Sequence, residues 1–124
     1  AHPGGIMTKI PIVILMDKSS ASGAEVLAGA LRDNGRAKIV GTNSFGKGTV
    51  NQLMPLSDCG EPNGCGAVYV SVGRWYTPNG TQIEGKGLTP DFPVDLTQDI
   101  YKKSGDVQML KAIDVLQQEV DAVH

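Results

Sequence analysis

The stretch IPIVILMDKSSASGAEVLAGALRDNGRAKIVG, residues 10–41, decides the fold class. Its first part, residues 10–16, is a continuous apolar run rich in β-branched side chains, which is typical of a central strand covered on both faces. Apolar residues then recur at helical spacing over residues 23–35, with Gly35 as a stop, and residues 37–41 show a second strand pattern. The order strand, helix, strand predicts an α/β unit with a mixed sheet.

The rest of the chain predicts further strands and a final helix. Residues 49–56 and 67–72 flank a loop as a candidate hairpin, and a turn at residues 78–80 separates two short strands. Residues 85–96 show no regular pattern, whereas residues 106–123 predict an amphipathic helix. Its apolar stripe, which we expect to pack in the core, consists of Met109, Ile113, Leu116, Val120 and Val123.

The composition sets the size of the core and the classes of partner. The chain has 124 residues, of which 40% are hydrophobic, and can bury one modest core in a single domain. Its formal net charge is −2, from 11 basic and 13 acidic residues without long runs of either sign, which argues against nucleic acid and anionic membranes as partners. No apolar run approaches the roughly 20 residues of a membrane span, and the first residues lack the sections of a signal peptide.

Two cysteines, Cys59 and Cys65, bracket a stretch rich in Gly, Pro, Asn and Asp that we expect to be an exposed loop. A disulfide between them would stabilise the fold by roughly 2–3 kcal/mol and would indicate an oxidising compartment. The alternative is two free thiols in a reducing cytoplasm. We expect no metal site, because structural zinc needs four soft ligands and no histidine or second cysteine pair is near.

The stretch GTNSFGKGTV, residues 41–50, partly matches a phosphate-binding loop, because Gly41, Gly46 and Lys47 fall on its G-x-x-x-x-G-K frame. The motif needs Ser or Thr directly after the lysine, but this chain has Gly48, and a strand pattern follows where a helix should begin. We therefore expect another role for Lys47. The alternatives are a solvated surface charge and a catalytic base.

Three serines, Ser19, Ser20 and Ser22, lie between the predicted strand at residues 10–16 and the predicted helix. A strand-to-turn-to-helix setting can present a nucleophilic hydroxyl at the sheet edge, where the helix dipole favours developing negative charge. The alternative is an N-cap, which is a common role of serine at a helix start.

A nucleophilic serine needs a base. A Ser-His-Asp arrangement is nearly excluded, because the only histidines, His2 and His124, lie at the two chain ends. A lysine can serve when burial disfavours its charged form. Lys47 is the candidate, since Gly46 and Gly48 remove side-chain bulk and let the backbone bring it close to another element.

These features together resemble a known family. The stretch SASGAEVLAGALRDNGRAKIVGTNSFGKGTV, residues 20–50, is similar to the core of the carboxyl-terminal processing proteases (peptidase family S41), the tail-specific serine proteases of bacteria and chloroplasts. That family carries S-A-S-A-S-E, then a helix ending near D-x-x-R-A, then T-F-G-K-G-x-V-Q. Its Y-x-T-P-x-G and G-I-x-P-D segments resemble residues 76–94, so the resemblance covers roughly residues 10–96.

The resemblance implies a Ser-Lys dyad, with Ser22 as the nucleophile and Lys47, 25 residues later, as the general base. Lys47 would take the proton as Ser22 attacks the scissile carbonyl, and water would then hydrolyse the acyl-enzyme. The N–H of Gly23 is expected to be an oxyanion donor. Asp33 falls on an aspartate that the family needs, and we expect it to be structural because it lies at the end of the predicted helix. Glu25, in the first helical turn, is a second supporting residue.

This chain departs from the family pattern in two respects. The family has a glutamine four residues after the lysine, commonly credited with orienting it, whereas this chain has Asn51 followed by Gln52, which strand alternation would turn to the opposite face. The family's PDZ domain and the upstream half of its core are expected to precede residue 1. We therefore expect a partial domain of the ClpP/crotonase-like α/β fold, with a mixed sheet and flanking helices, that cleaves poorly or not at all alone.

The function implied by the resemblance is that of a serine endopeptidase that cleaves proteins near their C-termini in an exported, periplasmic or envelope-associated location. No cofactor is expected, because the chain supplies the nucleophile, the base and an oxyanion donor. Two alternatives stay open. One is a non-catalytic scaffold or peptide-binding relative in which Ser22 only caps a helix; the other is a crotonase-type acyl enzyme, which would not need Lys47. The sequence also leaves an oligomer open.

Overall fold

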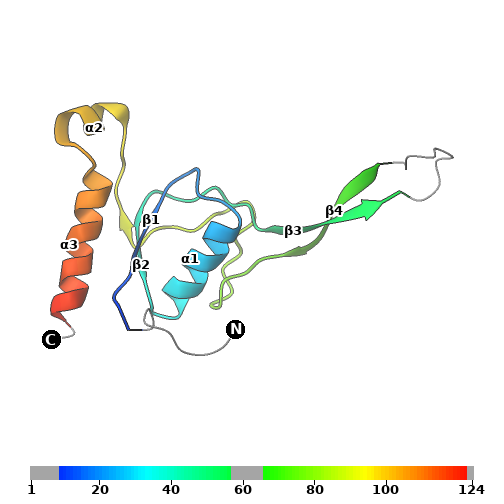
Figure 1. Cartoon of the computed structure of the whole chain (residues 1–124), viewed down its shortest axis with the longest axis horizontal. Helices are drawn as coiled ribbons and strands as arrows, with labels where there is room; N and C mark the ends of the chain where they lie inside the picture. Colours follow the sequence, from blue (N-terminus) through cyan, green and yellow to red (C-terminus); the bar gives the residue numbers. More distant parts are fainter. Residues whose placement is uncertain (1–8, 57–65, 123–124) are drawn as a thin grey trace.

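The computed structural model describes residues 9–56 and 66–122 of the chain. Its elements are, in chain order, β1 (Val13–Met16), α1 (Gly23–Asp33), β2 (Lys38–Gly41), β3 (Thr49–Pro55), β4 (Ala67–Arg74), β5 (Phe92–Pro93), α2 (Gln98–Ser104) and α3 (Val107–Asp121). Strands β1, β2 and β5 form an α/β body with the helices, and the β3–β4 ribbon extends away from this body (Figure 1). The α/β class is confirmed, with the parallel strands in one sheet and the antiparallel strands in another.

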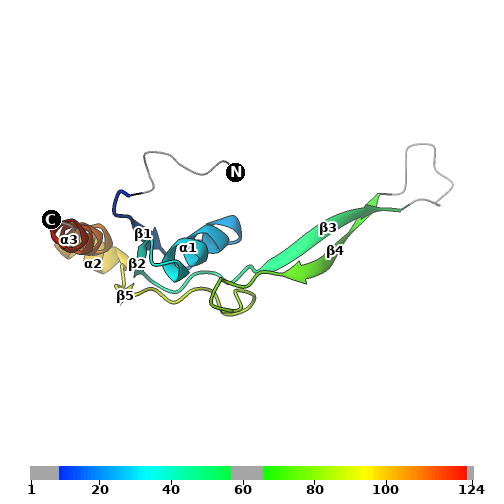
Figure 2. The same ribbon diagram turned by 90° about the horizontal axis from the view of Figure 1, so that it is seen from below.

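The parallel sheet has the strand order β1-β2-β5, and helices pack on both of its faces (Figures 1 and 2). Successive residues of β2 show this directly, because Ile39 faces the α1 side and Val40 faces the α3 side. The core on the α1 side consists of buried Met16, Ala28, Ile39, Ile83 and Leu88. The core on the α3 side consists of buried Val40, Ala112 and Val115. The body therefore has helix, sheet and helix layers, with β2 at the centre of the described sheet.

The apolar run at residues 10–16 forms a shorter strand than predicted, at another place in the sheet. Among the described residues β1 pairs with β2 alone, so it lies at an edge of the described sheet. Its residues alternate between the two cores, but Leu15 remains 41% exposed. The central position predicted for this run is occupied by β2, because the order of strands depends on pairings that local hydrophobicity does not encode.

Two elements, β5 within residues 85–96 and α2 just after them, were not predicted from the sequence. β5 has only two residues, and it pairs in parallel with Val40 and Gly41 of β2. Pro93 is tolerated there because β5 lies at the edge of the described sheet. α2 has no buried residue, and its start is marked by Thr97, whose hydroxyl accepts a hydrogen bond from the N–H of Ile100 at 3.2 Å.

The final helix is present, but its core face differs from the predicted apolar stripe. α3 buries Ala112 and Val115, whereas Met109 and Ile113 of the predicted stripe are 45% and 56% exposed. Val123 lies outside the described residues. The small Ala112 side chain lets the helix lie close to β1 and β2, and a count of large apolar residues does not detect such a contact.

The predicted hairpin is confirmed as the antiparallel β3–β4 ribbon, in which Leu53 lies opposite Tyr69 and the register shifts after Val50. The loop that joins the strands contains Cys59 and Cys65 and lies outside the described residues, so the predicted disulfide stays a prediction. Within the described part of the chain, no helix is both long and apolar enough to cross a membrane.

Candidate active site

Ser22 lies at the turn between β1 and α1, as the N-cap residue of the helix, with φ 57° and ψ −120°. It is the one non-glycine residue with a positive φ within residues 9–56 and 66–122. Such a backbone conformation is costly for an L-residue and persists only where the surroundings hold it, which is common at functional sites. Ser22 is also exposed, as a nucleophile on a strand-to-helix turn must be.

The other two candidate serines form the turn before Ser22. The Oδ1 atom of Asp17 accepts hydrogen bonds from the N–H of Ser19 at 2.9 Å, the N–H of Ser20 at 3.1 Å and the hydroxyl of Ser20 at 3.1 Å. The carbonyl of Ser20 accepts from the N–H of Phe45 at 2.9 Å. This last bond ties the serine turn to the segment that carries the candidate lysine.

Lys47 lies between β2 and β3, where two glycines let the main chain pass against a turn that contains Glu84 and Gly87. A Cβ added to Gly46 would lie 2.8 Å from the nitrogen of Gly87, and one added to Gly48 would lie 2.3 Å from the nitrogen of Glu84. Both distances are too short for a side chain, and Gly46 also has a φ of 89°. The flanking glycines thus permit the close approach to another segment that the sequence predicts.

Glu25 connects the two candidate residues, and it is fully buried with 0% exposure. Its Oε2 atom accepts hydrogen bonds from the N–H of Ser22 at 2.8 Å and from the N–H of Lys47 at 2.9 Å. Its Oε1 atom accepts from the N–H of Gly46 at 2.7 Å and from the hydroxyl of Ser44. One carboxylate oxygen therefore holds the main chains of both Ser22 and Lys47.

The carboxylate of Glu25 is stabilised in its charged form. Burial by itself raises the pKa of Glu25, but the hydrogen bonds from one hydroxyl and three main-chain N–H groups outweigh it and hold the pKa below its usual value. Ser44 extends the network, since its hydroxyl oxygen accepts from the N–H of Leu88 at 2.7 Å. Ser44 was not predicted as a site residue, because its partners lie 19 and 44 residues away and leave no local signal.

A sequence model of peptidase family S41 matches residues 2–94 of this chain. The chain belongs to peptidase family S41. It is 44% identical over 95 residues to the carboxy-terminal-processing protease of Bartonella bacilliformis, covering 77% of this chain and 20% of that protein. It is 36% identical over 114 residues to the carboxy-terminal processing protease CtpB of Bacillus subtilis, covering 92% and 22%. This S41 chain thus spans about a fifth of the length of these relatives.

Solved structures also support the assignment of this chain to peptidase family S41. The photosystem II D1 C-terminal processing protease is 41% identical, with a TM-score of 0.61 over 68% of this chain and 20% of that one. The tricorn protease superposes with a TM-score of 0.67 over 90% of this chain and 10% of that one, and at 22% identity this likeness concerns the fold alone. The predicted family and the predicted partial α/β fold are confirmed.

The N–H group of Gly23, at the first position of α1, is free to donate a hydrogen bond. This N–H has no hydrogen-bond acceptor among the described residues, as is usual in the first turn of a helix. A Cβ added to Gly23 would meet no atom within 4 Å. The N–H is therefore accessible to the oxygen of an approaching carbonyl group, beside the Ser22 backbone.

The two amide candidates for orienting Lys47 are Asn51 and Gln52 of β3. The Oδ1 atom of Asn51 accepts from the hydroxyl of Ser71 at 2.7 Å, and its Nδ2 atom donates to the hydroxyl of Thr49 at 3.4 Å. Gln52 follows on the opposite face of β3 and is exposed. Among the described residues, neither amide is brought into a hydrogen bond with Lys47.

Asp33 connects the C-terminal end of α1 to the turn at Thr77 and Asn79. Its carboxylate accepts from the N–H of Asn79 at 3.0 Å, from Nε of Arg32 at 3.0 Å and from the side chain of Thr77. Burial raises the pKa of Asp33, but these hydrogen bonds and the charge of Arg32 outweigh it and lower the pKa. These contacts lie at the opposite end of α1 from Ser22.

Replacing Asp33 with asparagine is expected to destabilise the protein by about 1–2 kcal/mol at neutral pH, because three donors then share a single acceptor oxygen. Since the folded pKa is lowered, the stabilisation by Asp33 is present above the unfolded pKa of about 4 and is lost as the pH falls through the folded value. Thermal unfolding at several pH values should show the two proteins differing at neutral pH and converging in acid. A difference that is independent of pH would contradict a role for the charge.

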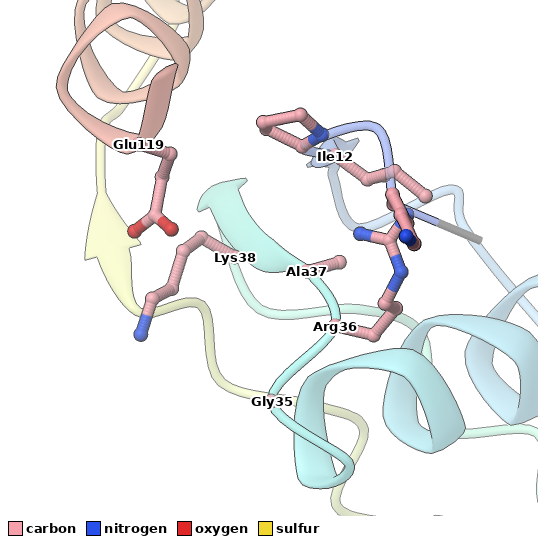
Figure 3. Close-up of a pocket in the computed structure, with 8 residues that line it drawn as sticks. Ile12, Gly35, Arg36, Ala37, Lys38 and Glu119 are labelled. Atoms are coloured by element: carbon pink, nitrogen blue, oxygen red, sulfur yellow. The ribbon is translucent and has the colours of Figure 1, made fainter. Parts of the chain in front are cut away.

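Two hollows lie at different ends of the α/β body. A cleft of about 440 Å³ borders the turn before Ser22, with Asp17, Lys18 and Asn43 in its lining, at the carboxyl ends of β1 and β2 where α/β sheets commonly bind ligands. A smaller cavity of about 130 Å³ lies at the start of β2, with Lys38 of β2 and Glu119 of α3 in its lining (Figure 3). None of the candidate catalytic residues lines this smaller cavity.

Proposed function

We propose that this chain is the C-terminal part of the catalytic core of a longer carboxyl-terminal processing protease, called the parent protease below. The parent protease is a serine endopeptidase that cleaves proteins near their C-termini, with Ser22 as the nucleophile and Lys47 as the general base. The observation that supports this most is the Oε2 atom of Glu25, which accepts the N–H groups of both residues at 2.8 and 2.9 Å. The main chains of two residues that are distant in sequence thereby share one acceptor beside an open helix N-terminus.

In the proposed reaction, the neutral amine of Lys47 accepts the hydroxyl proton as Oγ of Ser22 forms a bond to the scissile carbonyl carbon. The N–H of Gly23 stabilises the negative charge that develops on the carbonyl oxygen. The C–N bond then breaks, and Lys47 returns the proton to the leaving amine. Lys47 next takes a proton from water, which attacks the acyl ester, releases the new C-terminus and restores the hydroxyl of Ser22.

Lys47 is exposed among the described residues. Its proposed role as a base requires a less polar environment. Exclusion of water disfavours the charged ammonium group and so favours the neutral amine that a base requires. We propose that the upstream half of the core covers this site in the parent protease, and that a PDZ domain delivers substrate C-termini along its sheet edge. The 124 residues alone should then cleave peptides poorly or not at all.

The location proposed for the parent protease is exported, periplasmic or associated with the cell envelope. Its matched relatives include bacterial and chloroplast processing proteases, and the proposed Cys59–Cys65 disulfide would form in an oxidising compartment. Thiol counting under denaturing conditions tests the disulfide, since free thiols at both positions would argue for a reducing compartment.

The proposed function is tested by the rate at which the parent protease degrades an unfolded protein with an apolar C-terminus. Ser22→Ala is expected to lower this rate by at least ~10³-fold, because loss of the nucleophile removes most of the chemistry of a serine protease. Ser19→Ala is the control, expected to keep the wild-type rate, since Ser19 contributes a main-chain N–H to the turn. A folded Ser22→Ala variant with the wild-type rate would refute the proposal.

A further inference from the structure

The side chain of Lys47 has no anchor among the described residues, so its placement depends on the main chain. Neither of the ion pairs in the described part of the chain includes Lys47, and the amides of Asn51 and Gln52 do not bond to it. Glu25 holds the main chain on the N-terminal side, through the N–H groups of Gly46 and Lys47. The C-terminal side is held by a different carboxylate.

That carboxylate belongs to Glu84. The N–H of Gly48 donates to Oε2 of Glu84 at 2.6 Å in a half-buried setting. The carbonyl of Gly48 accepts from the N–H of Trp75 at 2.7 Å, and the carbonyl of Gly46 accepts from the N–H of Gly85 at 2.9 Å. Both glycines beside the lysine are therefore bonded to the segment that contains Glu84.

The turn that carries Glu84 is fixed by the hydrophobic core. Ile83 and Leu88 flank it and are 1% and 0% exposed. Within the turn, the N–H groups of Lys86 and Gly87 donate to the carbonyl of Ile83 at 3.1 and 2.9 Å. The core thus determines where the carboxylate lies, and a charged acceptor binds an N–H group more strongly than a neutral one.

We propose that Glu84 is a positioning residue for Lys47, an inference that rests on the proposed function. By holding the N–H of Gly48, Glu84 fixes the direction in which the lysine side chain leaves the main chain, and hence where Nζ meets the hydroxyl of Ser22. Glu84 thereby takes the orienting role that the family assigns to the glutamine replaced here by Asn51. Such positioning matters because a displacement of about 1 Å at a catalytic group can cost roughly 10²-fold in rate.

Steady-state kinetics of the parent protease on a peptide with an apolar C-terminus test this role. Glu84→Ala is expected to lower kcat at least about tenfold with KM changed less than about twofold, since the base is displaced and substrate contacts remain. Glu84→Gln keeps an acceptor oxygen and is expected to restore kcat to within about threefold of wild type. Lys86→Ala changes an exposed side chain of the same turn and should match wild type.

If Glu84→Ala does not fold, Glu84→Asp replaces it, because the shorter side chain keeps the charge but withdraws the acceptor from Gly48, and a roughly tenfold lower kcat is expected. A folded Ala or Asp variant with wild-type kcat would overturn the inference, as would a Gln variant no better than Ala. Ser22→Ala in the same assay separates the two proposals. If Ser22→Ala stays active, the proposed function fails; if it is inactive, the result at Glu84 concerns positioning alone.

Discussion

Replacing Lys47 with arginine will lower kcat/KM of the parent protease by at least ~10³-fold, because general-base catalysis is lost. Arginine keeps the positive charge but does not give up its proton at any accessible pH, so it cannot accept the hydroxyl proton of Ser22. Degradation of an unfolded protein with an apolar C-terminus measures the effect. Arginine, like lysine, is a long basic side chain, so the loss is expected to come from the missing proton transfer.

Lys38→Arg is the matched control for this substitution. Lys38 is an exposed lysine at the start of β2 that lines the smaller cavity (Figure 3), and none of the candidate catalytic residues lines that cavity. This variant is expected to keep wild-type activity. A folded Lys47→Arg variant that also keeps it would show that the base lies elsewhere, and Lys47 would then be the solvated surface charge that the sequence left as an alternative.

Replacing Glu25 with glutamine is expected to lower kcat/KM by roughly 10²-fold and to destabilise the fold by about 2–4 kcal/mol. The carboxylate accepts hydrogen bonds on both oxygens, and glutamine would point an NH₂ group at donors on one side. Ser22 and Lys47 would then lose their common acceptor, or Ser44 and Gly46 would lose theirs. Enzyme kinetics and hydrogen exchange over residues 42–48 report the two effects separately.

The stabilisation by Glu25 depends on pH. Because its folded pKa is lowered, the contribution is present above the unfolded pKa of about 4.3 and is lost as the pH falls through the folded value. Wild type and Glu25→Gln should therefore differ most at neutral pH. Glu119→Gln, at an exposed site on α3, controls for the loss of one charge. Unchanged activity and exchange in Glu25→Gln would contradict the role of this carboxylate as a common support.

Regular elements with strong periodicity were predictable from the sequence. Which elements pack beside one another in the fold was less predictable. Helix α1 and the β3–β4 ribbon follow their apolar spacing and turn residues closely. The edge position of β1 in the described sheet, by contrast, follows from its pairing with β2, which begins more than twenty residues later. β5 is too short to show a pattern, and the core face of α3 buries Ala112 and Val115, which lie outside the predicted apolar stripe.

The residues of the candidate site also differ in how far the sequence predicted them. Ser22 and Lys47 were selected by the resemblance to the processing proteases. Their local surroundings, a strand-to-helix turn and two flanking glycines, fit these roles but left a helix cap and a surface charge as alternatives. Ser44 and Glu84 were missed, since their partners lie 19 and 36 residues away and neither residue belongs to a recognisable motif. Whether Asn51 reaches the lysine was left open by the sequence, and in the structure a hydroxyl of the neighbouring strand engages its side chain.

The central claim, that Lys47 activates Ser22, is tested most directly by the rate at which a fluorophosphonate reacts with the folded parent protease, with the adduct located by mass spectrometry. In the wild type the adduct is expected on Ser22, and in Lys47→Arg it should form at least ~10²-fold more slowly, as expected when a general base is removed. An adduct on another residue, or equal rates in the two folded proteins, would contradict the claim.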